Sequence, residues 1–246
     1  LGQDIDGENS GDFFGNKVFL SGAGNILAVG AYKNDGNGAD AGHVKVFNLI
    51  GNEWIQIGDD IDGNNAGDLF GIDISLSNDG TVLAIGGMHN SDNGYRSGHV
   101  RIFSFELAGW MQIGEDINGE SVEDKLGSSV SIGDDGNSIA IGAIFRDING
   151  TNDGYVRIYS RIDNSWEHLE DIDGAAHNDQ FGIDISLSGD GKTLAIGGDY
   201  HGGPGGYRSG HAQVYSLYSS NSCGCMDENA CNFDYEADYD DGSCEE

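Results

Sequence analysis

Apolar residues alternate with polar ones in short runs along this chain, and nowhere do they recur at helical spacing over three turns. Alternation with a period of two is typical of β-strands that bury one face. Turn signals separate the runs, for example Asn78-Asp79-Gly80 and Asp134-Asp135-Gly136. The pattern predicts an all-β chain of short antiparallel strands joined by glycine-rich turns.

Four such runs form a unit that recurs four times with a period of about 56 residues, which is the spacing of Trp54, Trp110 and Trp166. The first run covers residues 18–21, 72–77, 130–132 and 183–188. The second, Leu-Ala-Ile-Gly or a close variant, covers 27–30, 83–86, 139–142 and 194–197. The third covers 44–47, 100–103, 156–159 and 212–215, and the fourth begins at each tryptophan.

Four antiparallel strands per repeat predict a β-propeller of four-stranded blades over residues 1–218, with repeats at about 1–56, 57–112, 113–168 and 169–218. The second strand carries leucine or isoleucine on one face and alanine followed by glycine on the other. We expect these small residues to let a neighbouring sheet approach closely.

The turn Phe14-Gly15 returns as Phe70-Gly71, Leu126-Gly127 and Phe181-Gly182. The order Phe-Gly, strand, Leu-Ala-Ile-Gly, loop and Gly-His-Val-x-Ile-Phe resembles the FG-GAP repeat of integrin-α-type propellers. Residues 54–63, Trp-Ile-Gln-Ile-Gly-Asp-Asp-Ile-Asp-Gly, are similar to blades of bacterial and algal surface proteins. The resemblance implies an adhesive, extracellular propeller. The family's D-x-D-x-D-G calcium loop is replaced here by short turns such as 77–80, so the resemblance implies no calcium at those turns.

The repeats leave two possibilities for closure of the ring, because four copies of the first three strands accompany three tryptophan strands. The first residues, Leu1-Gly2-Gln3-Asp4-Ile5, match the end of a tryptophan strand. Either they complete the last blade and close a four-bladed ring, which we expect, or further blades precede Leu1. Because the chain begins with leucine, we expect it to be processed or trimmed.

Acidic residues outnumber basic ones by 42 to 11, which gives a net charge of −31. This charge argues against nucleic acid or an anionic membrane as a partner. It fits either the solvated surface of a protein from a saline habitat or the binding of cations. No apolar run reaches the roughly 18 residues of a membrane-spanning helix, so we expect no membrane insertion.

The cysteines all lie in residues 219–246, at Cys223, Cys225, Cys231 and Cys244. An even number in a short acidic segment predicts a small module with two disulfides and an extracellular or cell-surface location. Cys223 and Cys225 are too close to pair, so Cys223 bonds either Cys231 or Cys244. Zinc is the alternative, although the segment has no C-x-x-C pair or nearby histidine. The segment resembles a module at the C-termini of secreted marine surface proteins.

An acidic segment follows each tryptophan strand, and a similar cluster lies in the tail. Oxygen ligands two residues apart, followed by glycine and a later carboxylate, suit calcium. Alternatively, aspartate and asparagine form turns by bonding their own backbone. The candidate calcium ligands are Asp4, Asp6, Asp12, Asp60, Asp62, Asp68, Asp116, Asn118, Asp124, Asp171, Asp173 and Asp179, with Asp234, Asp238, Asp240 and Asp241 in the tail.

The remaining polar residues give little indication of a catalytic or metal site. His43, His99 and His211 begin equivalent third strands, with Tyr155 in the remaining repeat, which favours a packing role. No Ser, Cys or Lys nucleophile stands in a recognisable setting, so we expect no enzyme. The sequon that begins at Asn149 lies in a glycine-rich loop and is a candidate glycosylation site.

Together these features predict an extracellular structural or adhesive protein. It would assemble with copies of itself, as a homo-oligomer or filament, or with a surface protein or glycan, through its propeller faces. The alternative is a carbohydrate-binding, lectin-like propeller, in which Tyr95-Arg96 and Tyr207-Arg208 would contact the sugar.

Overall fold

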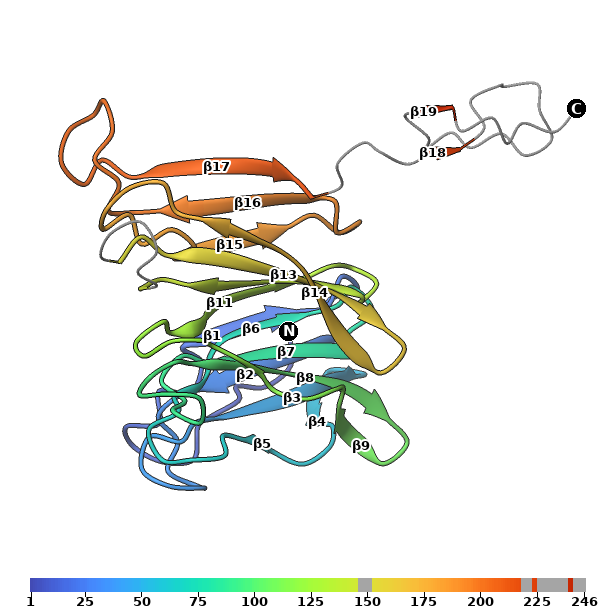
Figure 1. The fold of residues 1–246 in the computed structure, drawn as a ribbon. Helices are drawn as coiled ribbons and strands as arrows, with labels where there is room; N and C mark the ends of the chain where they lie inside the picture. Colours follow the sequence, from blue (N-terminus) through green and yellow to red (C-terminus); the bar gives the residue numbers. More distant parts are fainter. Residues whose placement is uncertain (146–151, 218–222, 225–238, 241–246) are drawn as a thin grey trace, which may run out of the picture. The chain divides into compact units, whose positions relative to one another are not determined.

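A computed structural model of the chain describes residues 1–145, 152–217, 223–224 and 239–240 (Figure 1). These residues form strands and turns, and none of them belongs to a helix long and apolar enough to cross a membrane. The chain divides into two compact units, Leu1–Val214 and Tyr215–Glu246. The prediction of an all-β chain is confirmed for the described residues.

The first unit is a series of antiparallel sheets, which we call blades 1 to 4. Blade 1 contains β1 (Lys17–Leu20), β2 (Ile26–Ala31), β3 (His43–Ile50), β4 (Glu53–Gln56) and β5 (Ile61–Asp62). Blade 2 contains β6 (Phe70–Leu76), β7 (Val82–Gly87), β8 (His99–Glu106), β9 (Gly109–Gln112) and β10 (Ile117–Asn118). Blade 3 contains β11 (Leu126–Ile132), β12 (Ser138–Ala143), β13 (Tyr155–Ile162) and β14 (Ser165–Asp173). Blade 4 contains β15 (Asp184–Leu187), β16 (Thr193–Gly198) and β17 (His211–Ser216). In the second unit, β18 (Cys223–Gly224) pairs in parallel with β19 (Tyr239–Asp240).

Each complete blade has four antiparallel strand positions, as expected for propeller blades. The outer position is one continuous strand in blade 3, β14, and two pieces in blades 1 and 2, because β4 and β5 both pair with β3, and β9 and β10 both pair with β8. The acidic segments of blades 1 to 3, which the sequence predicted as loops, therefore continue into the outer strand position at residues 61–62, 117–118 and 171–173, whereas Asp4-Ile5-Asp6 lies in no strand. The reason is the isoleucine between their polar residues, since Ile61, Ile117 and Ile172 are all buried.

Consecutive blades pack face to face. We call the face of a blade that meets the preceding blade its front face, and the opposite one its rear face. The interface between blades 1 and 2 joins the rear-face residues Ile26, Ala28, Val44, Val46 and Ile61 to the front-face residues Phe70, Ile74, Leu76, Leu83, Ile85 and Phe103. A second cluster joins the rear face of blade 2 to the front face of blade 3 in the same way. These apolar interfaces form the core of the unit.

Glycine sets the spacing between the blades. A Cβ on Gly30, Gly86 or Gly142 would lie 2.3, 2.1 or 2.3 Å from the carbonyl oxygen of the Phe-Gly or Leu-Gly turn of the next blade. Two backbones can approach so closely only where no side chain stands between them. The predicted close approach at the Leu-Ala-Ile-Gly strand is confirmed.

The predicted four-bladed closed ring is wrong. Blade 1 packs against blade 2 and blade 4 packs against blade 3, and within the described residues no strand pairs with the outer edge of β17. Trp54 Nε1 donates to the carbonyl of Leu1 at 3.1 Å, just as Trp110 Nε1 donates to the carbonyl of Ile57 at 3.2 Å. The N-terminal segment thus occupies the position in front of blade 1, because it makes the contact that joins one repeat to the next.

Candidate functional site

The acidic segment of blade 1 meets the start of the third strand. Asp60 Oδ2 lies 3.7 Å from His43 Nδ1 and 3.2 Å from Lys45 Nζ, and Lys45 Nζ also lies 2.6 Å from Glu8 Oε1. Asp62 Oδ1 lies 4.0 Å from the same His43 nitrogen, since the register places Asp62 opposite His43. Side chains of the third strand therefore balance the charge of these carboxylates.

Arginine takes the place of lysine in blades 2 and 3. Asp116 Oδ2 lies 3.5 Å from His99 Nδ1, and its Oδ1 lies 3.8 Å from Arg101 Nε. In blade 3, Arg157 donates two hydrogen bonds to Asp171, at 2.9 and 3.0 Å. The remaining predicted ligands of these two segments, Asn118 and Asp173, stand opposite His99 and Tyr155 in the strand register.

The later carboxylate of each acidic segment has a different role. Asp68 Oδ2 accepts hydrogen bonds from the backbone N–H of Asn65 at 3.0 Å and from Asn90 Nδ2 at 3.3 Å, and Asp124 Oδ2 accepts one from the backbone N–H of Ser121 at 2.8 Å. This is the turn chemistry considered as the alternative to calcium. The later carboxylate is buried in all four acidic segments, where it is Asp12, Asp68, Asp124 or Asp179.

The structure therefore separates the carboxylates that the sequence grouped. Three groups among the described residues offer three ligand atoms within 4.8 Å of one another, and none of the three is a set of carboxylates from one acidic segment. Asp4 and Asp6 are exposed. Calcium binding by the acidic segments stays a prediction.

Several predicted residues lie outside the described part of the chain. They are the tail ligands Asp234, Asp238 and Asp241, the cysteines Cys225, Cys231 and Cys244, and the glycosylation candidate Asn149. The backbones of Cys223 and Asp240 belong to β18 and β19. The disulfides, the glycan and the calcium site of the tail stay predictions.

Each of the three ligand groups contains the histidine that begins a third strand. The groups are Glu8–His43–Asp60, Asp92–His99–Asp116 and Asp179–His201–His211. Lys45 in the first and Arg101 in the second lie beside the carboxylates and supply positive charge. The third group differs, because the ion pairs found for Asp179 within the described residues are with the two histidines alone.

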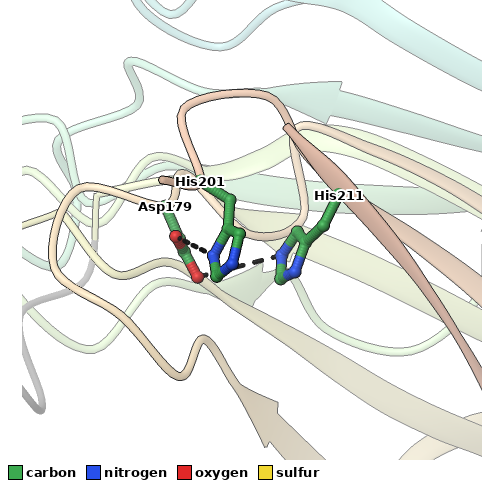
Figure 2. Close-up of side chains that lie close together, drawn as sticks. All are labelled: Asp179, His201 and His211. Atoms are coloured by element: carbon green, nitrogen blue, oxygen red, sulfur yellow. Dashed lines mark hydrogen bonds and ion pairs between the residues drawn. The ribbon is translucent and has the colours of Figure 1, made fainter. Parts of the chain in front are cut away.

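Figure 2 shows how the third group is arranged. Asp179 Oδ1 lies 2.7 Å from His201 Nδ1, and Asp179 Oδ2 lies 3.8 Å from His211 Nε2. The two imidazole rings stack in parallel, with centroids 4.0 Å apart and an interplanar angle of 2°. The side chain of Asp179 is 1% exposed, and those of His201 and His211 are 25% and 16% exposed. The group is thus a nearly buried carboxylate beside two partly accessible imidazoles.

Three elements of blade 4 position these side chains. Asp179 precedes β15, His201 follows β16, and His211 begins β17. Gly198 at the end of β16 makes room for the His211 ring, since a Cβ there would lie 2.7 Å from His211 Nε2. Burial, together with the neighbouring His201, lowers the pKa of His211. This shift favours the neutral form of the imidazole, which is the form that binds metals.

Sequence reasoning missed His201. It predicted packing roles for the strand-start histidines, and this is confirmed for His43 and His99, which are buried and lie edge-on against Phe14 and Phe70. The available signal for His201 was its place in the repeat, after the second strand, where blades 1 and 2 have Asn34 and Asn90.

No known family model matches the sequence, and no curated protein matches it either. Many solved structures match this chain, among them two bacterial proteins. One is a protein from Bacteroides uniformis provisionally named a 6-phosphogluconolactonase, at 13% identity and a TM-score of 0.54, over 81% of this chain and 49% of that one. The other is a protein of unknown function from Desulfotomaculum acetoxidans, at 15% identity and a TM-score of 0.48, over 73% and 47%.

The chain thus spans about half the length of the structures that it matches. At 13% identity, the likeness to the Bacteroides protein shows the fold alone. The resemblance to FG-GAP repeats stays a prediction. The described residues form an all-β, β-propeller-like arrangement of four-stranded antiparallel sheets.

Proposed function

We propose that this chain is an extracellular structural or adhesive protein of the β-propeller type, whose end blades pair with those of a second copy. One observation carries the proposal: the two uncovered end faces are the two halves of the interface that the chain repeats between its own blades. The association surface is the side of each end blade, whereas the sequence had suggested the flat propeller faces. The extracellular location rests on the predicted disulfides of the tail.

Part of the front face of blade 1 is exposed among the described residues, although Val29 and Phe47 on the same face are buried. Val18 and Leu20 are 55% and 51% exposed, whereas their equivalents in blade 2, Ile74 and Leu76, are 0% and 3% exposed. A Cβ on Gly15 would meet no atom within 4 Å, although Gly71 in the equivalent turn lies against blade 1. Blade 1 therefore presents part of the apolar surface that each later blade buries.

The rear face of blade 4 is exposed as well within the described residues. Val214 is 69% exposed, whereas the equivalent Val46 and Ile102 are both 1% exposed. A Cβ on Gly197 would have its nearest neighbour at 3.6 Å, compared with 2.1 Å at the equivalent Gly86. Blade 4 thus exposes the position that blades 1 and 2 bury against the next blade.

Polar groups of the two faces also match. Between blades 2 and 3, Asp73 Oδ2 accepts the backbone N–H of Val130 at 2.8 Å, and Ser75 Oγ accepts that of Ile132 at 3.1 Å. Between blades 3 and 4, Ser131 Oγ accepts the backbone N–H of Leu187 at 2.9 Å. The equivalent acceptors of blade 4 are Asp184 and Ser186, which are exposed, and the equivalent donors of blade 1 are the N–H groups of Val18 and Leu20.

A second copy of this chain supplies both missing surfaces at once. Its front face would meet the rear face of the first copy as blade 3 meets blade 2, with Val214, Asp184 and Ser186 in the places of Ile102, Asp73 and Ser75, whereas Thr193 and Ala212 stand where blade 2 has Val82 and Val100. Such a contact is heterologous, so two copies that meet at both ends close into a ring, and copies that meet at one end extend into a filament.

Gly197→Ala tests this contact. The added methyl group fits the isolated chain, but it would meet the incoming turn of the second copy as closely as a Cβ on Gly86 would meet Gly127. Overpacking of this kind costs about 1–3 kcal/mol, so we expect association to weaken about tenfold or more. Sedimentation velocity over a concentration series measures the effect.

The control is Gly202→Ala, because a Cβ on Gly202 meets no atom within 4 Å. It should associate as the unmodified protein does. A protein that stays monomeric at every concentration would contradict the proposal and would mean that other blades or another protein cover these faces. Equal association of the Gly197→Ala and Gly202→Ala variants would contradict the proposed contact.

A second candidate function, carbohydrate binding, is favoured by two matching loops. Tyr95 and Tyr207 are 58% and 85% exposed, and Arg96 and Arg208 lie over their rings at 5.0 and 5.1 Å. An exposed aromatic ring beside a hydrogen-bond donor suits the apolar face and hydroxyl groups of a sugar. Both arginines have positive φ, 49° and 56°, so the two loops present the pair in the same way.

If these loops bind sugar, the double change Tyr95→Ala and Tyr207→Ala should abolish binding on a glycan array. Leu107→Ala provides the control, because Leu107 is also fully exposed but lies in a different turn. If the unmodified protein binds no glycan, carbohydrate binding is excluded and the structural function remains. The provisional name of the Bacteroides protein adds no support for an enzyme, since the likeness extends to the fold only.

A further inference from the structure

Blade 4 departs from the other blades at one buried carboxylate. In blade 1, Asn34 Nδ2 donates to Asp12 Oδ2 at 2.8 Å while Asn34 Oδ1 accepts the backbone N–H of Gly36 at 2.8 Å. Asn90 makes the same pair of contacts in blade 2. In these blades an amide serves both the carboxylate and the loop. In blade 4 the amide is replaced by the imidazole of His201, which is a metal-binding group.

His211 also differs from its equivalents. His43 and His99 face a carboxylate of the outer strand, Asp60 at 3.7 Å and Asp116 at 3.5 Å. The described part of blade 4 has no outer strand, and the carboxylate that His211 faces there is Asp179, 3.8 Å from its Nε2. Two imidazole nitrogens and a carboxylate therefore converge at one point of blade 4 (Figure 2).

The two atoms that face each other across this group lack partners. Asp179 Oδ2 and His211 Nε2 are both buried and make no hydrogen bond within the described residues. They stand 3.8 Å apart, which is too far for a hydrogen bond. Two ligands of one tetrahedral zinc ion, each about 2.0–2.1 Å from the metal, are about 3.4 Å apart. The separation is thus close to the one that a bridging metal ion requires.

Charge favours a cation at the same point. Asp179 is buried, and an ionised carboxylate is costly to bury without a compensating charge. Lys45 and Arg101 pair with the partly exposed Asp60 and Asp116 in the groups of blades 1 and 2, but in the described residues neither a lysine nor an arginine pairs with the buried Asp179.

We propose that Asp179, His201 and His211 bind a divalent transition-metal ion, with Zn²⁺ as the natural occupant and water in the fourth position. Two imidazole nitrogens and one carboxylate oxygen form a ligand set of the zinc type, whereas calcium takes oxygen ligands and six or more of them. When Nδ1 of the neutral His201 imidazole binds the metal, the ring proton stands on Nε2, and the bond to the metal replaces the hydrogen bond between Nδ1 and Asp179 Oδ1. The ligand atoms, within 4.8 Å of one another, close on the metal by rotation of the two side chains.

His201→Asn is the decisive variant, because it installs the residue that blades 1 and 2 carry at this position and so preserves a partner for Asp179. Titration calorimetry with ZnCl₂ on the chelator-stripped full chain, with its thiols alkylated to remove cysteine ligands, should give one tight site. In His201→Asn the affinity should fall by more than about a hundredfold. Substitution with Co²⁺ should give the visible absorption of a tetrahedral site in the unmodified protein and not in the variant.

His168→Asn is the matched control, since His168 lies in blade 3 and pairs with Asp171 at 2.8 Å. Its zinc affinity should equal that of the unmodified chain, and millimolar calcium should not displace the zinc. Near-equal melting temperatures would show that both variants are folded. An unmodified chain that binds no zinc, or equal zinc affinity in His201→Asn, would overturn the proposal. This result is independent of whether the end blades associate.

Discussion

Gly86→Ala should lower the free energy of unfolding by about 3 kcal/mol, which for a domain of this size is roughly 6–12 °C in melting temperature. The new Cβ would lie 2.1 Å from the carbonyl oxygen of Gly127, which belongs to the backbone of blade 3. The turn at Gly127 has no room to shift locally, because it also lies against β8. A Cβ on Gly127 would be 2.4 Å from the carbonyl oxygen of His99. The two blades must therefore separate, and the apolar cluster between them loses contacts.

Gly197→Ala is the matched control for this effect, because it makes the same change at the equivalent position of an uncovered blade. The nearest neighbour of its Cβ would be 3.6 Å away, so we expect a change within about 0.5 kcal/mol. Both variants are compared by calorimetry below the concentration at which the chain associates. Equal melting temperatures would show that blades 2 and 3 tolerate a wider spacing than the structure has.

Arg157→Met should also destabilise the protein strongly, by roughly 3 kcal/mol. The Arg157 side chain is 7% exposed, donates to Asp171 at 2.9 and 3.0 Å and to Glu120 at 2.8 Å, and lies over the Tyr155 ring at 5.4 Å. Most of the loss comes from Asp171, which is 22% exposed, since Glu120 is 53% exposed and its charge is screened by water. Midpoints of urea unfolding measure the loss.

The effect should not depend on pH near neutrality. Burial by itself lowers the pKa of Arg157, but the hydrogen bonds to Asp171 and Glu120 and the charge interaction with Tyr155 outweigh it, so the net shift is upward. A cationic group with a raised pKa contributes its full stability at every pH below its unfolded value, and loses it only far into the alkaline range. A loss that varied between pH 6 and 8 would point to another group.

Arg161→Met is the control for Arg157. Arg161 lies four residues further along the same strand, β13, and its Nε donates to the carbonyl of Asp163 at 3.1 Å in an exposed setting. Its replacement should change stability by about 0.5 kcal/mol or less. If both arginine variants were equally stable, the buried network around Arg157 would make no net contribution to the free energy of unfolding.

The sequence by itself determined the strands and their order in each blade. Alternation at residues 44–47 and 100–103 and the glycine turns that bound them are local properties, and local backbone preferences decide them. The close approach of blades also followed from sequence, because alanine and glycine at 84 and 86 leave no side chain between two sheets. The packing role of His43 and His99 could be read from their equivalence in the repeats.

Tertiary structure alone decided where the polar groups went. The sequence pattern of the acidic segments predicted calcium loops. In the structure Ile61 is buried and pairs with the third strand, so that the preceding Asp60 lies beside Lys45. Asp68 turns inward to hold the backbone of its own loop. Asp179, His201 and His211 are separated by 22 and 10 residues, and only the pairing of β15, β16 and β17 brings them together.

The exposure of the two end blades also depends on contacts between distant parts of the chain. Four repeats are visible in the sequence, but whether blade 4 meets blade 1 depends on how each sheet is set against the next, which no single repeat encodes. Val18 and Val214 occupy the same positions in the repeat as buried apolar residues of other blades, and only the arrangement of the blades exposes them. Strand identity is thus a local property of this chain, whereas its exposed faces and its Asp–His–His group are products of contacts between distant residues.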